Sequence, residues 1–307
     1  MDQFISNFYL LFQFPIVNLK VIIDGIMVGA IFALAAYGLA LVWGVMNVKN
    51  LAQGDFVIAG GYVAWYSSTQ MGAYSIHPLL GVPLAFIVMG GIGWVCYKLI
   101  INRVIERDLF TSLLATFGLA IMMAQILNLL FGSDTQSIQL PYEKIQLFGG
   151  VVDLPIAKLI GVGLAAVLAL GVILFMRYSR MGQAIRATAQ DPRAARVLGI
   201  NTEKVYAFTF SLNAAICGAA GAIIVMVWVI QPFYGIVYSI RAFVVVTAAG
   251  LGNLPGVIAA GLGLGVLEQY GALIFGIGYQ QAIAVILLLI VLCIRLAQQQ
   301  RVRQALQ

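Results

Sequence analysis

The sequence predicts an all-α, polytopic transmembrane helical bundle, because apolar runs of spanning length recur along almost all of it. Hydrophobic residues make up 62% of the 307 residues and charged residues only 9%, whereas soluble domains carry roughly 25% charged residues. An apolar run of about 20 residues is long enough to cross a bilayer as a helix. We therefore expect residues 1–307 to form a single membrane-spanning domain, with no separate soluble domain.

The apolar runs predict eight to ten spans, and nine is the preferred number. Residues 4–17 are apolar but short and contain Pro15, so we expect residues 1–19 to form an interfacial segment rather than a span. Residues 56–71 and 234–250 are short runs that leave the count open. The nine predicted spans are residues 20–45, 56–71, 77–101, 109–131, 156–177, 205–230, 234–250, 256–275 and 279–296.

Two of these spans carry glycines at the spacing that lets helices approach closely. Gly25 and Gly29 lie in the first span, and Gly261 and Gly265 lie in the eighth. Two glycines four residues apart expose the backbone on one face of a helix. Each pair is therefore expected to contact a neighbouring helix.

Lysine and arginine residues predict the orientation, because they concentrate in cytoplasmic loops. The spans alternate if residues 177–204 and the tail, residues 297–307, are both cytoplasmic. Thirteen of the 17 basic residues then lie inside, and the N-terminus lies outside. The net charge of +6 follows from this asymmetry and does not indicate nucleic-acid binding. The four basic residues at the outer face are Lys20, Lys144, Lys158 and Arg241.

The longest polar stretch, residues 177–204, carries six basic residues between two predicted spans, and we call it the basic loop. Asp191 precedes a proline and Gly199 follows an apolar residue, which predicts short helices at about residues 181–190 and 192–198. A helical, basic loop suits the docking of a partner protein; the alternative is that its charge only sets the topology. The candidate docking residues are Arg180, Met181, Gln183, Ile185, Arg186, Asp191, Arg193, Arg196 and Leu198.

A second polar cluster, residues 46–56, lies directly before the short second span. Non-helical backbone is tolerated at membrane depth where it lines a cavity or is covered by protein. Asn50, Gln53 and Asp55 would then contact a polar solute or hold a broken helix in place. The alternative is an ordinary cytoplasmic loop in which Asp55 caps the next helix. The candidate residues of the substrate path are Asn47, Asn50, Gln53, Gly54, Asp55, Gly60, Gly61 and Glu268.

Few ionisable residues lie inside the predicted spans. Asp24, Arg241 and Glu268 are the candidates for an intramembrane ion pair, with Arg241 facing either acid. The alternative is that each reaches the interface alone. Proton- or sodium-coupled transporters usually carry several buried acids near the midplane. Their scarcity here favours an external energy source.

The sequence gives little support for catalysis or for a bound metal. Its one histidine, His77, lies at the edge of a span, and its cysteines, Cys96, Cys217 and Cys293, lie in apolar runs. No Gly-Lys dipeptide occurs, so the chain has no phosphate-binding loop for ATP. We therefore expect no catalytic residues, no metal site and no cofactor in this chain.

Three stretches together resemble the LivH-type permease subunits of ATP-binding-cassette importers for branched-chain amino acids. They are NLAQGDFVIAGGY (50–62), RYSRMGQAIRATAQDPRAARVLGIN (177–201) and AAGLGNLPGVIAAGLGLGVLE (248–268), and they imply alignment from about residue 20 to the end. The second stretch is similar to the loop by which such permeases dock their ATPases. The first departs from the family pattern, because Gln53 replaces a common histidine and Asp55 a common glutamate.

The resemblance implies a bacterial inner-membrane importer with two related permeases and two cytoplasmic ATPases that bind ATP and Mg. It also implies an extracytoplasmic solute-binding protein and a small-molecule solute, with membrane lipid around the spans. Branched-chain or other hydrophobic amino acids are the favoured solutes; urea, short amides and aromatic acids are the alternatives. A stand-alone secondary transporter or channel is the alternative of another class, and a membrane-embedded enzyme comes third.

Overall fold

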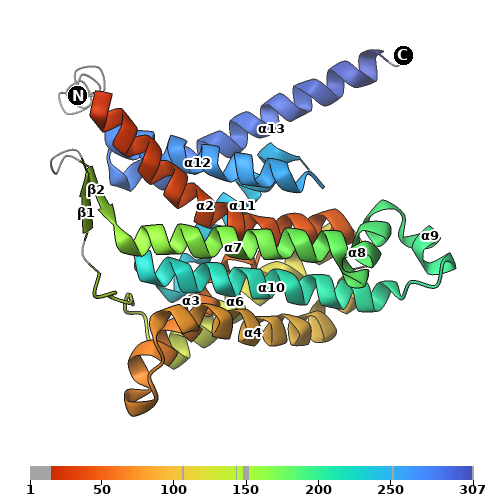
Figure 1. Cartoon of the computed structure of the whole chain (residues 1–307). Coiled ribbons are helices and arrows are strands. Elements are labelled where there is room, and N and C mark those ends of the chain that lie inside the picture. Colours follow the sequence, from red (N-terminus) through yellow and green to blue (C-terminus); the bar gives the residue numbers. More distant parts are fainter. Residues whose placement is uncertain (1–14, 106, 143, 148–151, 251, 306–307) are drawn as a thin grey trace.

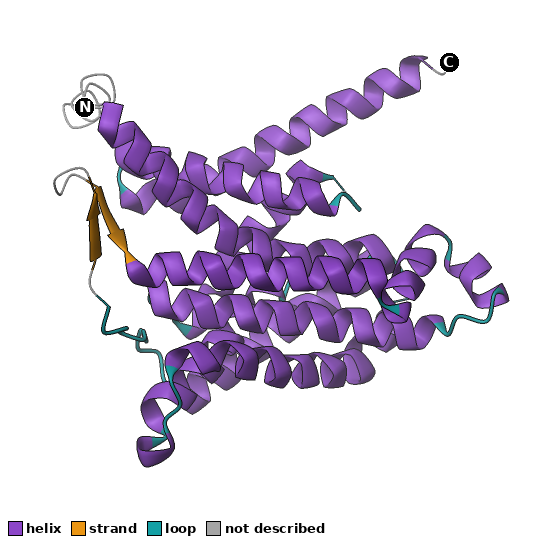
Figure 2. Cartoon of the chain, viewed as in Figure 1, coloured by secondary structure: helices purple, strands orange, loops and turns teal. Residues whose placement is uncertain are grey.

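The computed structural model describes residues 15–105, 107–142, 144–147, 152–250 and 252–305. Long helices lie side by side in a bundle, with a β-hairpin at one end and two short helices at the other (Figure 1). Figure 2 shows that the described chain is almost entirely helical. The predicted all-α, polytopic bundle is confirmed.

Each helix follows from one of the apolar runs or from a capped polar stretch. Two π-helical turns, Tyr66–Gln70 and Tyr97–Ile101, continue α3 and α4, and strands β1 (Lys144–Leu147) and β2 (Val152–Pro155) pair antiparallel. The helices are α2 (Pro15–Met46), α3 (Gln53–Trp65), α4 (Pro78–Cys96), α5 (Asn102–Val104), α6 (Leu109–Phe131), α7 (Ile156–Tyr178), α8 (Arg180–Gln190), α9 (Pro192–Val197), α10 (Thr202–Val227), α11 (Gly235–Ala249), α12 (Leu254–Phe275) and α13 (Gln280–Ala305).

Eight helical segments in the described residues are long and apolar enough to cross a membrane. The predicted span at residues 56–71 is not one of them, because α3 has only 13 residues before its π turn. It begins three residues earlier than predicted, at Gln53. Within the described ranges, the bundle therefore contains eight helices of spanning length and one shorter buried helix.

The N-terminal boundary differs from the prediction. Helix α2 already includes Pro15, so residues 15–19 belong to the first span and not to a separate interfacial segment. Residues 1–14, which make up the rest of that predicted segment, lie outside the described residues. At the other end, α13 continues through the predicted tail as far as Ala305.

Helices α2 and α10 form the centre of the bundle. About nine-tenths of the apolar stretch of α2 is buried (89%), and α10 is similar at 83%, whereas the figures for α7 and α13 are 22% and 6%. A helix that is apolar on all sides suits either the interior or the membrane. The exposed apolar faces of α7 and α13 are therefore among the surfaces available to lipid or to other spanning chains.

The two predicted glycine pairs contact each other. A Cβ atom on Gly25 would lie 2.5 Å from the Cα atom of Val266 on α12, and one on Gly265 would lie 2.2 Å from the Gly25 carbonyl oxygen. Gly29 and Gly261 also meet, because a Cβ atom on Gly29 would lie 2.6 Å from the Gly261 carbonyl oxygen. The expected close helix contact is confirmed, and it joins α2 to α12.

Replacing Gly265 with alanine is predicted to lower the stability of the protein, because the new methyl group must push α12 away from α2. Overpacking of this kind costs about 1–3 kcal/mol. The measurement is the thermal unfolding midpoint of the purified protein in detergent. Gly263→Ala is the matched control on the same helix, since no atom lies within 4 Å of its Cβ position. Equal midpoints for the two variants would contradict the assigned contact.

Candidate functional site

The chain between α2 and α3, residues 47–52, turns back into the bundle. Asn47 ends α2 with a φ of 53°, a left-handed conformation that asparagine tolerates better than most residues. Gln53, the first residue of α3, donates from Nε2 to the carbonyl oxygen of Ala35 at 2.8 Å. Ala35 lies eleven residues before Met46, the last residue of α2, which is about 16 Å along the helix axis. Helix α3 therefore starts deep inside the bundle.

Side chains from two other helices satisfy the backbone of this re-entrant segment. Thr116 Oγ1 on α6 accepts from the Leu51 N–H group at 3.3 Å. Ser239 Oγ on α11 accepts from the Gly54 N–H group at 2.8 Å and donates to the Leu51 carbonyl oxygen at 2.9 Å. A membrane offers no water to replace such bonds, so non-helical backbone persists there only where protein provides them.

The predicted non-helical backbone inside the bundle is thus confirmed, and the alternative of an ordinary loop capped by Asp55 is wrong. Asn50 and Gln53 are both fully buried. Ala52 occupies the N-cap position of α3, and its side chain makes no cap hydrogen bond.

The two amide side chains of the segment hold it in place. Asn50 Oδ1 accepts from the Ala52 N–H group at 3.1 Å. Gln53 Nε2 lies 3.0 Å from Asn213 Oδ1 on α10, in addition to its bond with Ala35. Asn50 and Gln53 therefore fix the start of α3 against α2 and α10.

Asp55 differs from its polar neighbours. It is 5% exposed, its carboxylate accepts from its own backbone N–H group, and among the described residues no ion pair joins it to a cation. The carboxylate lies against Gly235, where a Cβ atom would be 2.1 Å from Oδ1. Gly235 is the first residue of α11 and Asp55 lies in the first turn of α3. The N-termini of two helices, which carry partial positive charge, therefore surround this acid.

The glycines predicted for the substrate path lie at helix contacts. A Cβ atom on Gly54 would lie 1.8 Å from the Gly235 carbonyl oxygen, and one on Gly60 would lie 2.2 Å from the Cα atom of Gly218. A Cβ atom on Gly61 would lie 3.1 Å from the Gly221 carbonyl oxygen. These positions set how closely α3 packs on α10 and α11.

The intramembrane charges form two separate pairs. Arg241 Nε on α11 lies 2.9 Å from Glu268 Oε1 on α12, and its guanidinium stacks 4.6 Å from the centre of the Phe32 ring. Asp24 pairs instead with Lys158 on α7, at 2.9 Å. Of the two pairings considered for Arg241, the structure contains the one with Glu268. Each pair ties two helices together, because separating buried opposite charges leaves each without a partner.

The basic loop folds into two capped helices, as predicted. Ser179 Oγ accepts from the Gly182 N–H group at 2.8 Å and starts α8. Asp191 Oδ1 accepts from the Arg193 N–H group at 2.8 Å and starts α9. Gly199 follows α9 with a φ of 83°, which favours glycine.

The candidate docking residues divide into two sets. Ile185 is buried, Arg186 donates to the carbonyl oxygen of Met176 at the end of α7, and Arg196 Nε donates to Thr202 Oγ1 at 2.8 Å. These three residues attach the loop to the spans. The outward set includes Leu198, whose exposed fraction is 79%, and its neighbour Val197 is 87% exposed. The remaining exposed candidates are Arg180, Gln183, Asp191 and Arg193, whereas Met181 is half-buried.

Sequence reasoning missed three residues that build this site: Thr116, Asn213 and Ser239. Each is a buried polar residue inside an apolar helix, and that isolation is the one signal that could have identified them. Their partners lie 65 to 188 residues away in the sequence, so no local pattern connects them.

A bundle of spanning helices with a re-entrant segment and a capped loop at one end defines a multi-pass membrane protein of the transporter class. The family model of the branched-chain amino acid transport system permease component matches residues 21–293. The chain belongs to this family, as its three motifs indicated.

Individual relatives agree with this assignment. The branched-chain amino acid permease BraD of Pseudomonas aeruginosa is 31% identical over 288 residues, covering 90% of this chain and 94% of BraD. LivH of Escherichia coli K12 is 29% identical, covering 90% and 93% of the two chains. A probable LivH of Methanocaldococcus jannaschii is also 29% identical and covers 90% of each.

One solved structure shares the fold. PsaBC from Streptococcus pneumoniae, determined in complex with Fab, superposes with a TM-score of 0.51 and covers 93% of this chain and 94% of its own. The two sequences are 12% identical, so the likeness concerns the fold alone.

Replacing Ser239 with alanine is predicted to destabilise the protein, because the Gly54 N–H group and the Leu51 carbonyl oxygen both lose a buried partner. Leaving a buried polar group unsatisfied costs about 1–3 kcal/mol. The thermal unfolding midpoint measures the loss. Ser68→Ala is the control, since Ser68 donates only to carbonyl oxygens of the preceding turn. A Ser239→Ala protein as stable as this control would contradict the assigned bonds.

Proposed function

We propose that this chain is the permease subunit of an ATP-binding-cassette importer for branched-chain or other hydrophobic amino acids. The observation that carries the proposal is the family match over residues 21–293, joined by relatives that cover about nine-tenths of the chain. Those relatives bear names of high-affinity branched-chain amino acid permeases. The chain forms one half of a path for solute and performs no reaction itself.

Energy enters through a separate chain. The sequence has no phosphate-binding loop, so ATP and Mg are bound and used by a cytoplasmic ATPase subunit. That subunit docks on the outward side of the basic loop, where exposed Val197 and Leu198 stand among basic side chains. A short helix presented to a groove is a common form of recognition.

The orientation follows from charge. Helices α8 and α9 lie at the opposite end of the bundle from the β-hairpin and the start of α2 (Figure 1). Basic residues concentrate at the α8–α9 end, which is the cytoplasmic side under the positive-inside rule. The N-terminus is then extracytoplasmic and the C-terminus cytoplasmic, in a bacterial inner membrane. A related second permease completes the path, and a solute-binding protein delivers the solute from outside.

Asp55 is the residue that we assign to the solute. Its buried carboxylate has no cationic partner among the described residues, and an unpaired ionisable group at membrane depth is usually functional. A carboxylate is the natural acceptor for the ammonium group of an amino acid. Asn50 and Gln53 shape the same region without being free to bind, because their amides already hold the re-entrant segment.

Reconstitution of the chain with its ATPase, its second permease and its binding protein in proteoliposomes tests the proposed function. Uptake of radiolabelled leucine should require internal ATP. Uptake by this chain alone under an ion gradient would instead establish the secondary-transporter alternative. A panel with urea, short amides and aromatic acids distinguishes the remaining solutes.

Changing Val197 and Leu198 to aspartate is predicted to abolish co-purification of the ATPase, because two apolar contacts become charged. Membrane insertion should be unaffected, since both side chains are exposed. Ile277→Asp is the control. Ile277 is also highly exposed, at 80%, but it lies outside the basic loop, just before α13 begins at Gln280. The docking assignment fails if the ATPase co-purifies equally with the unchanged protein, the Val197 and Leu198 double variant and the Ile277→Asp control.

Changing Asp55 to asparagine is predicted to lower ATP-dependent leucine uptake on the order of tenfold or more, because a charged hydrogen bond to ammonium contributes about 1.5–3 kcal/mol. Docking of the ATPase should be retained. Uptake kinetics measure the loss, and Asp24→Asn, which removes the carboxylate paired with Lys158, is the control for lost charge. Normal uptake by the Asp55→Asn protein would remove Asp55 from the path.

A further inference from the structure

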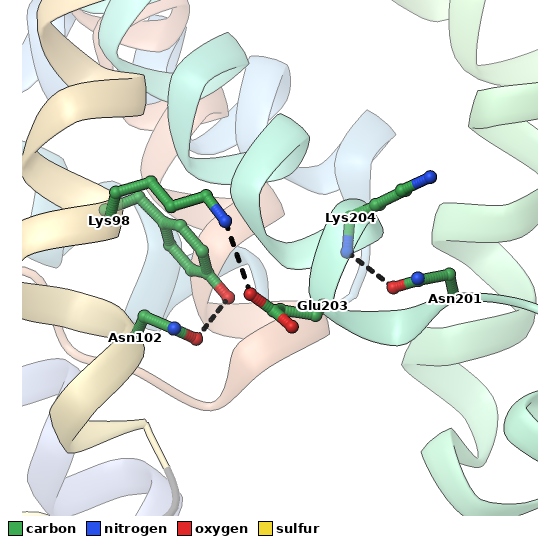
Figure 3. Close-up of polar contacts among 6 residues, drawn as sticks. Lys98, Asn102, Asn201, Glu203 and Lys204 are labelled. Carbon is green, nitrogen blue, oxygen red and sulfur yellow. Dashed lines mark hydrogen bonds and ion pairs between the residues drawn. The ribbon is translucent and has the colours of Figure 1, made fainter.

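A lateral groove opens between α4, α8 and α10, next to the basic loop. Its cavity measures about 430 Å³. It is separate from the re-entrant segment, because its lining comes from Trp94 on α4, Lys98 on the π turn after α4, Met181 on α8, and the N-cap and first three turns of α10. Figure 3 shows the polar side chains at its mouth. The groove shares Met181 with the candidate docking residues, and the transport function described above uses none of its other lining residues.

The mouth of the groove carries a net positive charge. Lys98 and Lys204 line it together with Glu203. Lys98 Nζ lies 3.3 Å from Glu203 Oε1, and these side chains are 44% and 58% exposed (Figure 3). A pair this exposed contributes little stability and exchanges partners readily. One of the two lysine charges is therefore left over for an anion.

Two helix N-termini add to this positive field. Helix α10 starts at the mouth, where Asn201 Oδ1 accepts from the Lys204 N–H group at 3.0 Å (Figure 3). Met181, the second residue of α8, lies in the wall. The N-terminal ends of both helices carry partial positive charge, which favours an anionic group close by.

The interior of the groove is largely apolar. Its floor is a single stripe of α10, since Lys204, Ala207, Phe208 and Ser211 follow each other at i, i+3, i+4 and i+7. Ser211 lies nine residues beyond Thr202, the start of α10, which is about 14 Å into the span. Trp94, which is 51% exposed, forms the outer wall. The occupant must therefore be anionic at one end and apolar along its length.

We propose that this groove binds one anionic phospholipid. Its phosphate lies at the mouth, which Lys98 and Lys204 both line, and an acyl chain runs along Trp94 and Phe208 toward Ser211. Basic residues at the cytoplasmic ends of spanning helices bind such headgroups, and aromatic side chains mark the same interface. A cytoplasmic subunit would not reach Ser211, which lies inside the span. A soluble anion would make no contact with the apolar wall of the groove.

The position of the lipid gives it a structural role. It contacts α4, α8 and α10 at once, and the contact to α8 is through Met181 in the first turn of the basic loop. The lipid is thus part of the support under that loop. This inference does not rest on the identity of the solute or on docking of an ATPase.

The test is native mass spectrometry of the assembled transporter, purified with phosphatidylglycerol and, separately, with phosphatidylcholine. We expect one retained phosphatidylglycerol for each copy of this chain and no retained phosphatidylcholine. Lys98→Gln with Lys204→Gln should reduce retention roughly tenfold or more, because each basic residue near an anionic headgroup contributes about a factor of five. The double Lys→Arg variant should restore it.

Matched variants make the outcome decisive. Arg103→Gln with Arg107→Gln removes two exposed positive charges from the same end of the bundle and should leave retention unchanged. Ala207→Leu narrows the groove without altering charge and should reduce retention. Equal loss in the two double Gln variants would overturn the proposal. Displacement of the lipid by inorganic phosphate would also overturn it. So would a crosslink from Trp94 to a second permease in place of lipid.

Discussion

Hydrogen bonding of one short stretch of backbone, residues 47–52, is the constraint on which the centre of the structure depends. This segment leaves the helical pattern at Asn47 and carries peptide groups into an apolar bundle. Each unsatisfied group there would cost several kcal/mol, since no water replaces a missing partner. Thr116 and Ser239 supply the partners from α6 and α11. The packing of α3, α6 and α11 is therefore coupled to one non-helical turn.

The re-entrant segment also explains why Asp55 stands apart. The amides of Asn50 and Gln53 are engaged in holding the segment, so their polarity is structural. Asp55 lies in the first turn of α3, and its carboxylate lies against Gly235, the first residue of α11. A buried carboxylate kept in that position costs desolvation energy. The segment is thus built to place one acid at depth.

The sequence predicted those features that depend on neighbours along the chain. The ends of α9 were predictable from Asp191 and Gly199, because a helix cap and a terminating left-handed glycine depend only on neighbouring residues. The glycine pairs of α2 and α12 indicate close helix contact by their spacing. Features that depend on tertiary partners were not predictable. Ser239 meets Leu51 across 188 residues, and Asp24 pairs with Lys158 rather than remaining alone. Arg186 belongs to the docking set by charge, yet its side chain binds carbonyl groups of α7.

Helix α10 connects the basic loop to the start of α3. It begins directly after the basic loop, where Asn201 caps it, and runs without interruption from Thr202 to Val227. Eleven residues into this helix, Asn213 contacts Gln53 at the start of α3. Helix α10 is continuous from just after the turn at Gly199 to Asn213 and beyond. Loop position and the surroundings of Asp55 are therefore linked by one helix and one amide pair.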